Sequence, residues 1–383
     1  MKFLFASDSL KGTISSEKTV ELLTRAAQEV FENCECIGVP IADGGEGTTD
    51  AVVKATEGEK IEVLVHGPLM RLEKSYYGKL DAERVIVEMA AASGLPMVEL
   101  EARNPLKTTS FGTGELLKAA IEAGFKSITI AIGGSATNDG GMGCMRALGM
   151  RFLDAQGNEL EGKGEDLIKV RKIDTSQMDQ RIKDIDFTVM CDVNNPLCGE
   201  NGATYTFGRQ KGGTPQILDE LEAGMRNYRN VIIQEYGIDP DKIPGAGAAG
   251  GIGAAFSVFL KANLKSGIEA ILDLIHFDRL LEGVSLVVTG EGCTDWQSCF
   301  GKVVQGVGKR CQKYKVPAVA LVGSMGQGAT DIFKYGIASI VTTVNAVMSL
   351  EEALENAEIL YYEGALRLFR LLKAGVDIKI SEG

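Results

Sequence analysis

The sequence predicts an α/β protein of two domains, one of them a parallel doubly wound sheet of the Rossmann or flavodoxin type. Apolar strand-like runs alternate with helical runs at both ends of the 383-residue chain, whereas short strands joined by turns occupy its middle. The expected domains are a discontinuous one of residues 1–59 and 285–383 and an inserted mixed α/β domain of residues 60–284. We expect the active site in the cleft between them.

The elements of the terminal domain follow from capping signals and periodicity. Ser15 or Ser16 can cap the first helix, and Ser349 with Glu352 has the spacing of a capping box. Strands are expected at Phe3–Ala6, Cys36–Ile41, Ser285–Thr289, Val316–Val322 and Ala338–Thr343. Helices are expected at Glu17–Phe31, Glu46–Thr56, Val303–Tyr314, Ala329–Tyr335 and Ser349–Lys373.

The inserted domain is expected to contain an antiparallel or mixed sheet, because its first strands are short and separated by turns. These strands are Lys60–Val65, Lys74–Leu80, Val85–Met89, Ser127–Ile132 and the run at 185–190. Helices are expected at Gly114–Gly124, Met142–Met150 and Ala254–Asn263.

Composition narrows the class of protein. A hydrophobic content of 45% with 24% charged residues is typical of an ordered globular protein, and a net charge of −12 argues against nucleic acid or an anionic membrane as partner. The chain starts directly with a strand and no apolar run approaches ~18 residues, so we expect a cytoplasmic protein. Cys34 and Cys36 share one face of a strand, which leaves a metal pair open, although reduced thiols fit a cytosolic protein better.

Asp192 lies in the most informative segment, Cys191–Gly212. A buried-looking strand here ends in an aspartate, two asparagines including Asn194, and a Pro-Leu-Cys-Gly turn, with Lys211 following. Rigid scaffolds usually hold catalytic groups on loops of this kind. The segment therefore predicts an active-site loop.

Gly133–Gly141, with the sequence GGSATNDGG, follows a strand and opens a helix. Small residues let backbone N–H groups surround an anion, and a helix N-terminus adds a favourable dipole. The loop therefore predicts a phosphate or substrate site, with a tight turn and helix cap as the simpler alternative. Candidate ligand-binding residues are Gly133, Gly134, Ser135, Thr137 and Asn138, and Asp139 could reach Mg²⁺.

Three further strands end in similar loops. The first carries Ser9 and Lys11, whose charge could meet a phosphate or carboxylate; the second carries Asp43, a candidate base or metal ligand. The third offers Glu291 and Asp295 as metal ligands. Glycines and side chains suited to ligand binding accompany them, namely Gly44, Gly45, Gln297 and Lys302. In a doubly wound sheet such loops share one edge, where ligands bind.

Pro244–Gly253 contains a G-x-G-x-x-G pattern but does not predict dinucleotide binding. The dinucleotide fingerprint requires a strand directly before it, whereas a proline-broken loop precedes this segment. A glycine-rich lead into a helix fits better. The chain also has no Walker A sequence, so a nucleotide must be held in another way.

The chain resembles the bacterial glycerate kinase family, the class without a Walker A loop. The resemblance runs over nearly the whole length, through DSLKGTIS, ADGGEGT, GGSATNDGG, CDVNNPLCG, FGRQKG, PGAGAAGGIGAA and MSLEEALENAE. It implies two α/β domains and the ATP- and Mg²⁺-dependent phosphorylation of D-glycerate, with 2-phosphoglycerate slightly favoured. Asp192 or Asp43 would orient the hydroxyl and accept its proton, and Lys11, the third catalytic candidate, would hold a phosphate or the substrate carboxylate. Lys211 and Lys302 would hold phosphates or the carboxylate.

Two positions depart from this family's pattern. Cys293 stands where the family usually has Arg, and Arg209 where it usually has Pro. Loss of a guanidinium from a phosphate-facing loop could weaken binding, which keeps a kinase for another small hydroxy acid as an alternative. A non-catalytic metabolite sensor is the second alternative, although a sensor needs no metal carboxylates. The sequence leaves monomer and dimer both open.

Overall fold

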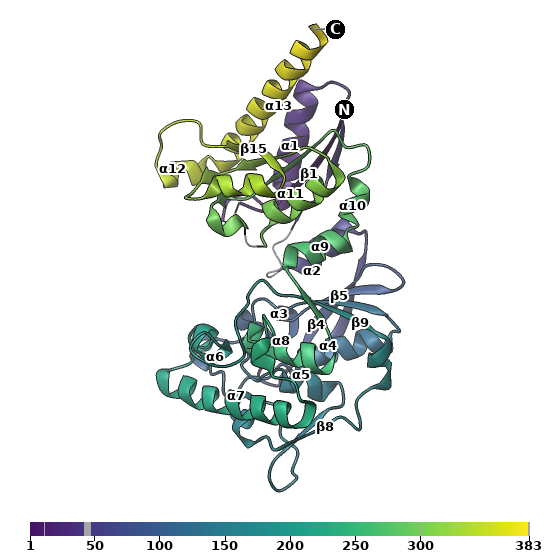
Figure 1. Ribbon diagram of the computed structural model, residues 1–383, viewed down its shortest axis with the longest axis vertical. Coiled ribbons are helices and arrows are strands. Elements are labelled where there is room, and N and C mark those ends of the chain that lie inside the picture. Colours follow the sequence, from purple (N-terminus) through teal and green to yellow (C-terminus); the bar gives the residue numbers. More distant parts are fainter. Residues whose placement is uncertain (11, 42–46, 300, 382–383) are drawn as a thin grey trace. The chain divides into compact units, whose positions relative to one another are not determined.

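The computed structural model describes residues 1–10, 12–41, 47–299 and 301–381. The chain forms two compact units, the first of Met1–Asp43 with Ile271–Gly383 and the second of Gly44–Ala270. The expected α/β class is confirmed, because helices and both parallel and mixed sheets are present (Figure 1).

The first unit is built on a parallel sheet in the order β15-β13-β11-β1-β2. Its strands are β1 (Lys2–Ser7), β2 (Glu35–Gly38), β11 (Leu286–Gly290), β13 (Ala318–Val322) and β15 (Ile337–Thr342). Phe3 on β1 pairs in register with Leu286 on β11, so the two ends of the chain meet in the centre of this sheet. A small parallel pair is formed by β12 (Cys293–Thr294) and β14 (Ser324–Met325), which follow β11 and β13 along the chain.

Helices α1 (Ser16–Val30) and α13 (Ala357–Ser381) pack side by side in the first unit (Figure 1). Their core includes Phe3 and Phe369, whose ring centroids are 5.3 Å apart. Ser15 caps α1 by accepting the N–H of Lys18, as expected from its sequence. The unit also contains α10 (Phe277–Leu280), η7 (Trp296–Cys299), α11 (Val303–Tyr314), η8 (Ala329–Tyr335) and α12 (Leu350–Glu355).

The second unit is built on a mixed sheet in the order β10-β9-β6-β5-β4-β3. Its strands are β3 (Glu59–His66), β4 (Leu72–Lys79), β5 (Arg84–Glu88), β6 (Ser127–Ala131), β9 (Asp186–Met190) and β10 (Asn263–Lys265). The strands β5, β6, β9 and β10 are parallel, whereas β3 and β4 run antiparallel. This mixture follows from the turn-linked strands seen in the sequence. A separate antiparallel pair is formed by β7 (Arg151–Leu153) and β8 (Lys172–Asp174).

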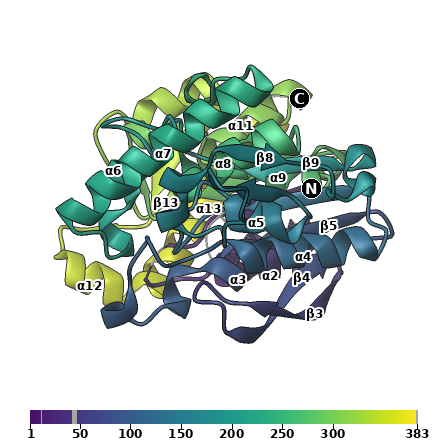
Figure 2. The same cartoon turned by 90° about the horizontal axis from the view of Figure 1, so that it is seen from below.

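Helices cover this mixed sheet, and α3 and α4 lie along β4 and β5 (Figure 2). The α-helices of the unit are α2 (Thr48–Ala55), α3 (Ala90–Ser93), α4 (Phe111–Glu122), α5 (Met142–Ala147), α6 (Ala203–Phe207), α7 (Pro215–Tyr236) and α8 (Ala248–Phe259). The 3₁₀ turns are η1 (Leu95–Met97), η2 (Leu100–Ala102), η3 (Gly164–Lys169), η4 (Gln180–Asp184), η5 (Arg209–Lys211) and η6 (Pro240–Lys242). Helix α9 (Gly267–Leu274) crosses the division between the units.

Several elements differ from the sequence expectation. The long C-terminal helix is broken at Asn356, and residues 329–335 form a 3₁₀ turn instead of an α-helix. The strand expected to reach Ile41 ends at Gly38. Helix α8 begins earlier than expected, through a left-handed stretch at 249–251. None of the helices among the described residues has the length and apolar character that crossing a bilayer requires.

Candidate active site

The carboxyl ends of the parallel strands in the second unit form one edge of its sheet. Glu88 pairs in register with Ala131, Ala131 with Met190, and Met190 with Lys265, so β5, β6, β9 and β10 end together. The Gly133–Gly141 loop and the loop carrying Asp192 therefore start from neighbouring strands. Ligands bind at such an edge in open α/β sheets, which makes it the candidate site.

The Gly133–Gly141 loop is accessible only at its start. Gly134 is exposed and Gly133 is half-buried, whereas residues 135–140 are buried. Gly134 has a φ of +71°, a left-handed conformation that glycine adopts without steric cost. The part of the loop that can meet a ligand is thus the exposed backbone of the two glycines, with Ser135 at 7% exposure behind them.

Asp139 is fully buried and holds this loop on the start of helix α5. Its Oδ2 accepts the N–H and the hydroxyl of Ser110, both at 2.7 Å, and the N–H of Gly143 at 3.3 Å. Its Oδ1 accepts the N–H of Gly141 at 3.0 Å. Burial raises the pKa of Asp139, and these donors oppose the rise. The sequence suggested a metal ligand at this position, but the hydrogen bonds favour a structural role.

Lys211 lies directly beneath the same loop at 2% exposure. Its Nζ donates to the Oγ of Ser135 at 2.9 Å and to the carbonyl oxygen of Thr137 at 2.7 Å. Burial lowers the pKa of Lys211 to about 7, and the charge of Asp139 opposes this shift. A lysine and an aspartate far apart in the sequence thus share one buried polar centre, with the loop wrapped around it.

The side chains of Thr137 and Asn138 belong to that centre as well. The Nδ2 of Asn138 donates to the Oγ1 of Thr204 on α6 at 3.1 Å. The Oγ1 of Thr137 and the Oδ1 of Asn138 are buried and have no hydrogen-bond partner among the residues that the structure describes. These residues point to internal order in the loop more than to direct contact with a ligand.

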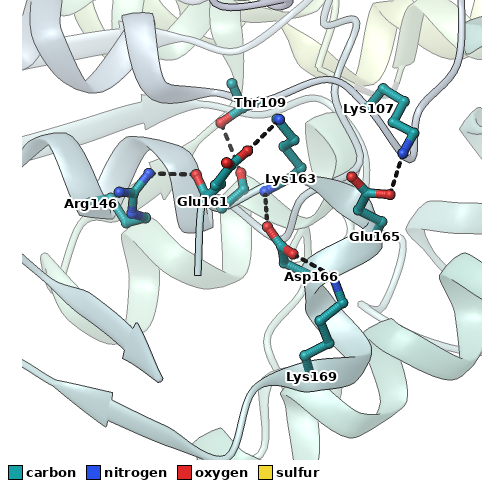
Figure 3. A network of polar contacts seen from close by, with 9 residues as sticks. Lys107, Thr109, Arg146, Glu161, Lys163, Glu165, Asp166 and Lys169 are labelled. Atoms are coloured by element: carbon teal, nitrogen blue, oxygen red, sulfur yellow. Dashed lines mark hydrogen bonds and ion pairs between the residues drawn. The ribbon is translucent and has the colours of Figure 1, made fainter. Parts of the chain in front are cut away.

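Residues 107–110 and a network of charged surface side chains support the Gly133–Gly141 loop. Thr108 donates to the carbonyl of Ala136 at 3.0 Å, and Thr109 donates to that of Gly162 at 2.8 Å. Figure 3 shows the charged network that involves Glu161, Lys163 and Asp166. It comprises the pairs Lys107–Glu165, Lys163–Glu161 and Lys169–Asp166, with Arg146 on the Glu161 carbonyl. These contacts fix the backbone of residues 107–110, and with it the position of Ser110, which donates to Asp139.

The glycine-rich segment before α8 packs against the loop instead of binding a dinucleotide. The N–H of Gly140 donates to the carbonyl of Gly250 at 3.0 Å. Gly250 has a φ of +72°, and a Cβ there would lie 2.0 Å from the carbonyl oxygen of Thr137. Only glycine fits so close to another backbone.

Gly250→Ala is therefore expected to cost several kcal/mol more than a left-handed glycine substitution alone. Gly237 is the matched control, because its φ is +69° and, apart from its chain neighbours, no atom of the described residues lies within 4 Å of a Cβ placed there. Gly237→Ala should cost about 1–2 kcal/mol, the penalty of the left-handed conformation. Urea unfolding of both variants measures the difference, and equal losses would contradict the packing argument.

Asp192 is exposed at the end of β9, and its Oδ1 accepts the N–H of Gly267 at 2.9 Å. The Pro-Leu-Cys-Gly turn that follows is held by two carboxylates, which the sequence analysis did not identify. The N–H of Cys198 donates to Asp241 at 2.9 Å, and that of Gly199 donates to Glu222 at 2.8 Å. Asn194 is exposed between these fixed points. An exposed carboxylate on a loop that backbone hydrogen bonds hold in place suits a group that handles substrate.

Glu88 is a further residue that the sequence analysis missed. It ends β5 at 4% exposure, and its two oxygens accept the N–H groups of Gly47 and Thr49 at 3.0 and 3.1 Å. A carboxylate at the N-terminus of α2 satisfies donors that no helical carbonyl reaches. The position of Glu88 at the end of an apolar strand could have identified it as a candidate site residue. The predicted site residues Asp43, Gly44 and Gly45, like Lys11, lie outside the described residues.

The first unit brings Ser9 and Glu291 to one sheet edge, since Ser7 pairs with Gly290. Glu291 is buried, its Oε1 accepts the hydroxyl of Thr294 at 2.9 Å, and its Oε2 lies 3.8 Å from the Nζ of Lys302. Burial raises the pKa of Glu291, and the charge of Asp295 acts in the same direction.

The remaining predicted residues of this unit are more exposed. Asp295 accepts the N–H of Gln297 at 2.8 Å in a local turn, and the side chain of Lys302 is 42% exposed. Cys293 is exposed on the same loop. In the described ranges, no three His, Cys, Asp or Glu side chains come together in a way that could hold a metal ion.

Asp139→Asn is expected to destabilise the protein by about 2–4 kcal/mol, because an amide NH₂ would face N–H donors that now have a carboxylate acceptor. Urea denaturation followed by fluorescence measures the loss. Asp154→Asn, at a surface turn whose carboxylate also accepts backbone N–H groups, is the matched control and should cost less than about 1 kcal/mol. A loss as small as the control's would exclude a structural role for Asp139.

Comparison with known proteins defines the class. The model of the glycerate kinase family matches residues 3–373. Glycerate 2-kinase of Escherichia coli K12 is 41% identical over 379 residues, which cover 99% of this chain and 98% of that protein. A glycerate kinase of Bacillus cereus is 42% identical over 94% of each chain. A crystal structure from Salmonella typhimurium LT2, provisionally described as glycerate kinase 2, matches with a TM-score of 0.87 at 40% identity and covers 98% of this chain and 99% of its own.

The fold and the matches together define a kinase that transfers a phosphoryl group to an alcohol. The chain belongs to the glycerate kinase family.

Proposed function

We propose that this protein transfers the γ-phosphoryl group of ATP to the 2-hydroxyl of D-glycerate. The observation that carries the proposal is the match to the glycerate kinase family over residues 3–373. The relative named glycerate 2-kinase, which is similar over almost its whole length, supports the 2-position. Half-buried Gly133, exposed Gly134 and exposed Asp192 lie on loops from adjacent strands, which supports a combination of backbone donors and a carboxylate in one region.

Asp192 is proposed as the group that orients the glycerate hydroxyl and accepts its proton. Phosphoryl transfer depends mainly on positioning and on neutralising charge, so a fixed carboxylate and backbone donors are the parts that the chain must supply. The N–H of Gly267 holds one oxygen of Asp192, which fixes the direction of the carboxylate. Asp43 stays the alternative base and Lys11 a further catalytic candidate, as the sequence predicts.

Gly133, Gly134 and Ser135 are proposed to bind the carboxylate or phosphate, with Asn194 at the neighbouring loop. Lys211 is proposed to act through Ser135, because its ammonium group donates to the Ser135 hydroxyl and leaves that O–H able to donate to a bound anion. Thr137, Asn138 and Asp139 are proposed as positioning residues behind them. In the first unit Ser9, Gln297 and Lys302 stay candidates for phosphate contacts. Gly44 and Gly45 stay candidates on the sequence prediction.

Mg²⁺ is proposed as the ion that accompanies ATP, with Glu291 and Asp295 as its carboxylates. Magnesium sites in kinases commonly use one or two carboxylates together with phosphate oxygens and water, so a cluster of three acidic residues is not required. Glu291 is buried and its negative charge is opposed by that of Asp295. A cation bound between the two carboxylates would offset both effects. The ion would neutralise charge on the phosphates.

Each unit is proposed to contribute residues to the reaction, because the candidate metal ligands and the candidate base belong to different units. A kinase gains from excluding water that would compete as phosphoryl acceptor. Small-angle scattering of the full chain with glycerate and a non-hydrolysable ATP analogue is expected to give a smaller radius of gyration than the free protein. An unchanged radius would contradict ligand-driven closure.

Release of ADP in a coupled assay tests the proposed activity. The purified protein is supplied with ATP, Mg²⁺ and, one at a time, D-glycerate, L-glycerate, glycolate, lactate and tartrate. We expect turnover with D-glycerate that chelation of the metal abolishes. Preferred turnover of another hydroxy acid would favour the alternative motivated by Cys293, and binding of glycerate with no turnover of any acid would favour a metabolite sensor.

A further inference from the structure

Cys34 and Cys36 bring two thiols together away from the candidate active-site residues. Their Sγ atoms are 3.7 Å apart, and both side chains are half-buried. Cys36 lies on β2 and pairs with Phe3 of β1, whereas Cys34 directly precedes that strand. Both pack against the apolar core between the sheet and α1, which fixes the two side chains on the same face.

We propose that Cys34 and Cys36 are a modification site, a dithiol that a small-molecule disulfide converts into an intramolecular disulfide bond. The sequence analysis left a metal pair open here. Two sulfur ligands without a third acidic, histidine or thiol group among the described residues make a weak metal site, whereas two thiols suffice for a disulfide.

The geometry permits closure with a small local movement. A disulfide has an S–S length of about 2.05 Å and Cα atoms about 4.4–6.8 Å apart. Residues two apart on an extended strand are separated by roughly 6.6 Å, at the upper end of this range. Closure therefore requires side-chain rotation and a slight shortening of the backbone at 34–36. β2 is the edge strand of its sheet, so its backbone pairs with a neighbouring strand, β1, on one side alone among the described strands.

The two thiols differ in a way that sets the order of reaction. Burial raises the pKa of Cys36 to about 12, and its hydrogen bond with Cys34 contributes to the rise. Cys36 thus keeps its proton at neutral pH while its sulfur contacts that of Cys34, so we assign the first attack to Cys34.

The exchange then proceeds in two balanced steps. The thiolate of Cys34 attacks one sulfur of oxidised glutathione, forms a mixed disulfide and releases one glutathione thiolate. Cys36 loses its proton to solvent as its sulfur displaces the second glutathione. The Cys34–Cys36 bond forms, two cysteine thiols are oxidised, and one glutathione disulfide is reduced to two thiols.

The test treats the folded full-length protein with oxidised glutathione, blocks free thiols with N-ethylmaleimide, and digests the product with trypsin. Cleavage after Arg25 and Lys54 gives a peptide of residues 26–54 that contains both cysteines and no other. We expect this peptide to be two hydrogen atoms lighter, without glutathione or maleimide. In Cys36→Ser it should instead carry one glutathione on Cys34, because nothing remains to displace it.

Three results would overturn the proposal: a wild-type peptide with two maleimides, one with glutathione on both cysteines, or one with glutathione on one cysteine and maleimide on the other. Cys293 provides an internal control, because it is exposed and is expected to take up glutathione in every variant. Circular dichroism of Cys36→Ser checks that the variant is folded, and the wild-type result decides the proposal by itself.

Discussion

Asp192→Asn is expected to lower kcat by about 100-fold or more, the usual scale of acid–base assistance. Asparagine has nearly the same shape and keeps one carbonyl oxygen to accept the N–H of Gly267, so the loop should stay in place. The amide cannot accept the proton of the glycerate hydroxyl, so the loss should fall on kcat, with little change in KM. Steady-state kinetics with varied glycerate measures both constants.

Asp186→Asn is the matched control, because Asp186 is exposed at the opposite end of the same strand. It is expected to leave kcat within about twofold, as surface substitutions usually do. Near-normal turnover of Asp192→Asn would remove this residue from the chemistry and transfer the role of base to Asp43.

Lys211→Met is expected to lower kcat/KM by about 10- to 100-fold, which corresponds to the loss of about 1.5–3 kcal/mol from a charge-assisted hydrogen bond. Methionine fits the buried space but leaves the carbonyl of Thr137 and the hydroxyl of Ser135 without their donor. Lys118→Met is the control, since Lys118 is exposed on α4 of the same unit. An equal effect of both changes would contradict a role for the buried ammonium group.

The pH dependence of stability gives an independent measure of the same group. The pKa of Lys211 is about 7 in the folded protein, well below the roughly 10.4 of an unfolded chain. Between these values the unfolded chain binds more protons, so stability should rise with pH from about 7 to 10 and be level below 7. Urea unfolding of the wild type should gain up to about 1.4 kcal/mol per pH unit over Lys211→Met in this window. A constant difference between the two proteins would contradict a buried lysine with a lowered pKa.

The sequence was sufficient to predict which loops follow the parallel strands and form the candidate site, because each loop follows an apolar strand and begins with small or polar residues. Parallel strands end at one edge, so Asp192 and the Gly133–Gly141 loop could be assigned to the same region before their pairing was known. The mixed sheet followed from short strands separated by turns. These predictions depend on the local pattern of apolar, polar and turn residues, which can be read from a single sequence.

Roles inside the loop could not be predicted, because they depend on partners distant in sequence. Asp139 appeared suited to a metal until Ser110 and the backbone of α5 were found to occupy its oxygens. Lys211 was expected to hold a phosphate or the carboxylate, whereas it is buried and donates to the hydroxyl of Ser135. Glu88 was missed because its partners, Gly47 and Thr49, belong to another helix. The role of each of these side chains depends on how the chain packs and on which buried hydrogen-bond donors need an acceptor.

Phosphorus NMR of the product formed from D-glycerate, ATP and Mg²⁺ tests the central claim most directly. A phosphate on the 2-oxygen couples to one methine proton and gives a doublet, whereas a phosphate on the 3-oxygen couples to two methylene protons and gives a triplet. We predict the doublet, together with the signals of ADP. A triplet would contradict the assigned position, and the absence of any phosphoglycerate signal from folded protein would contradict the kinase assignment itself.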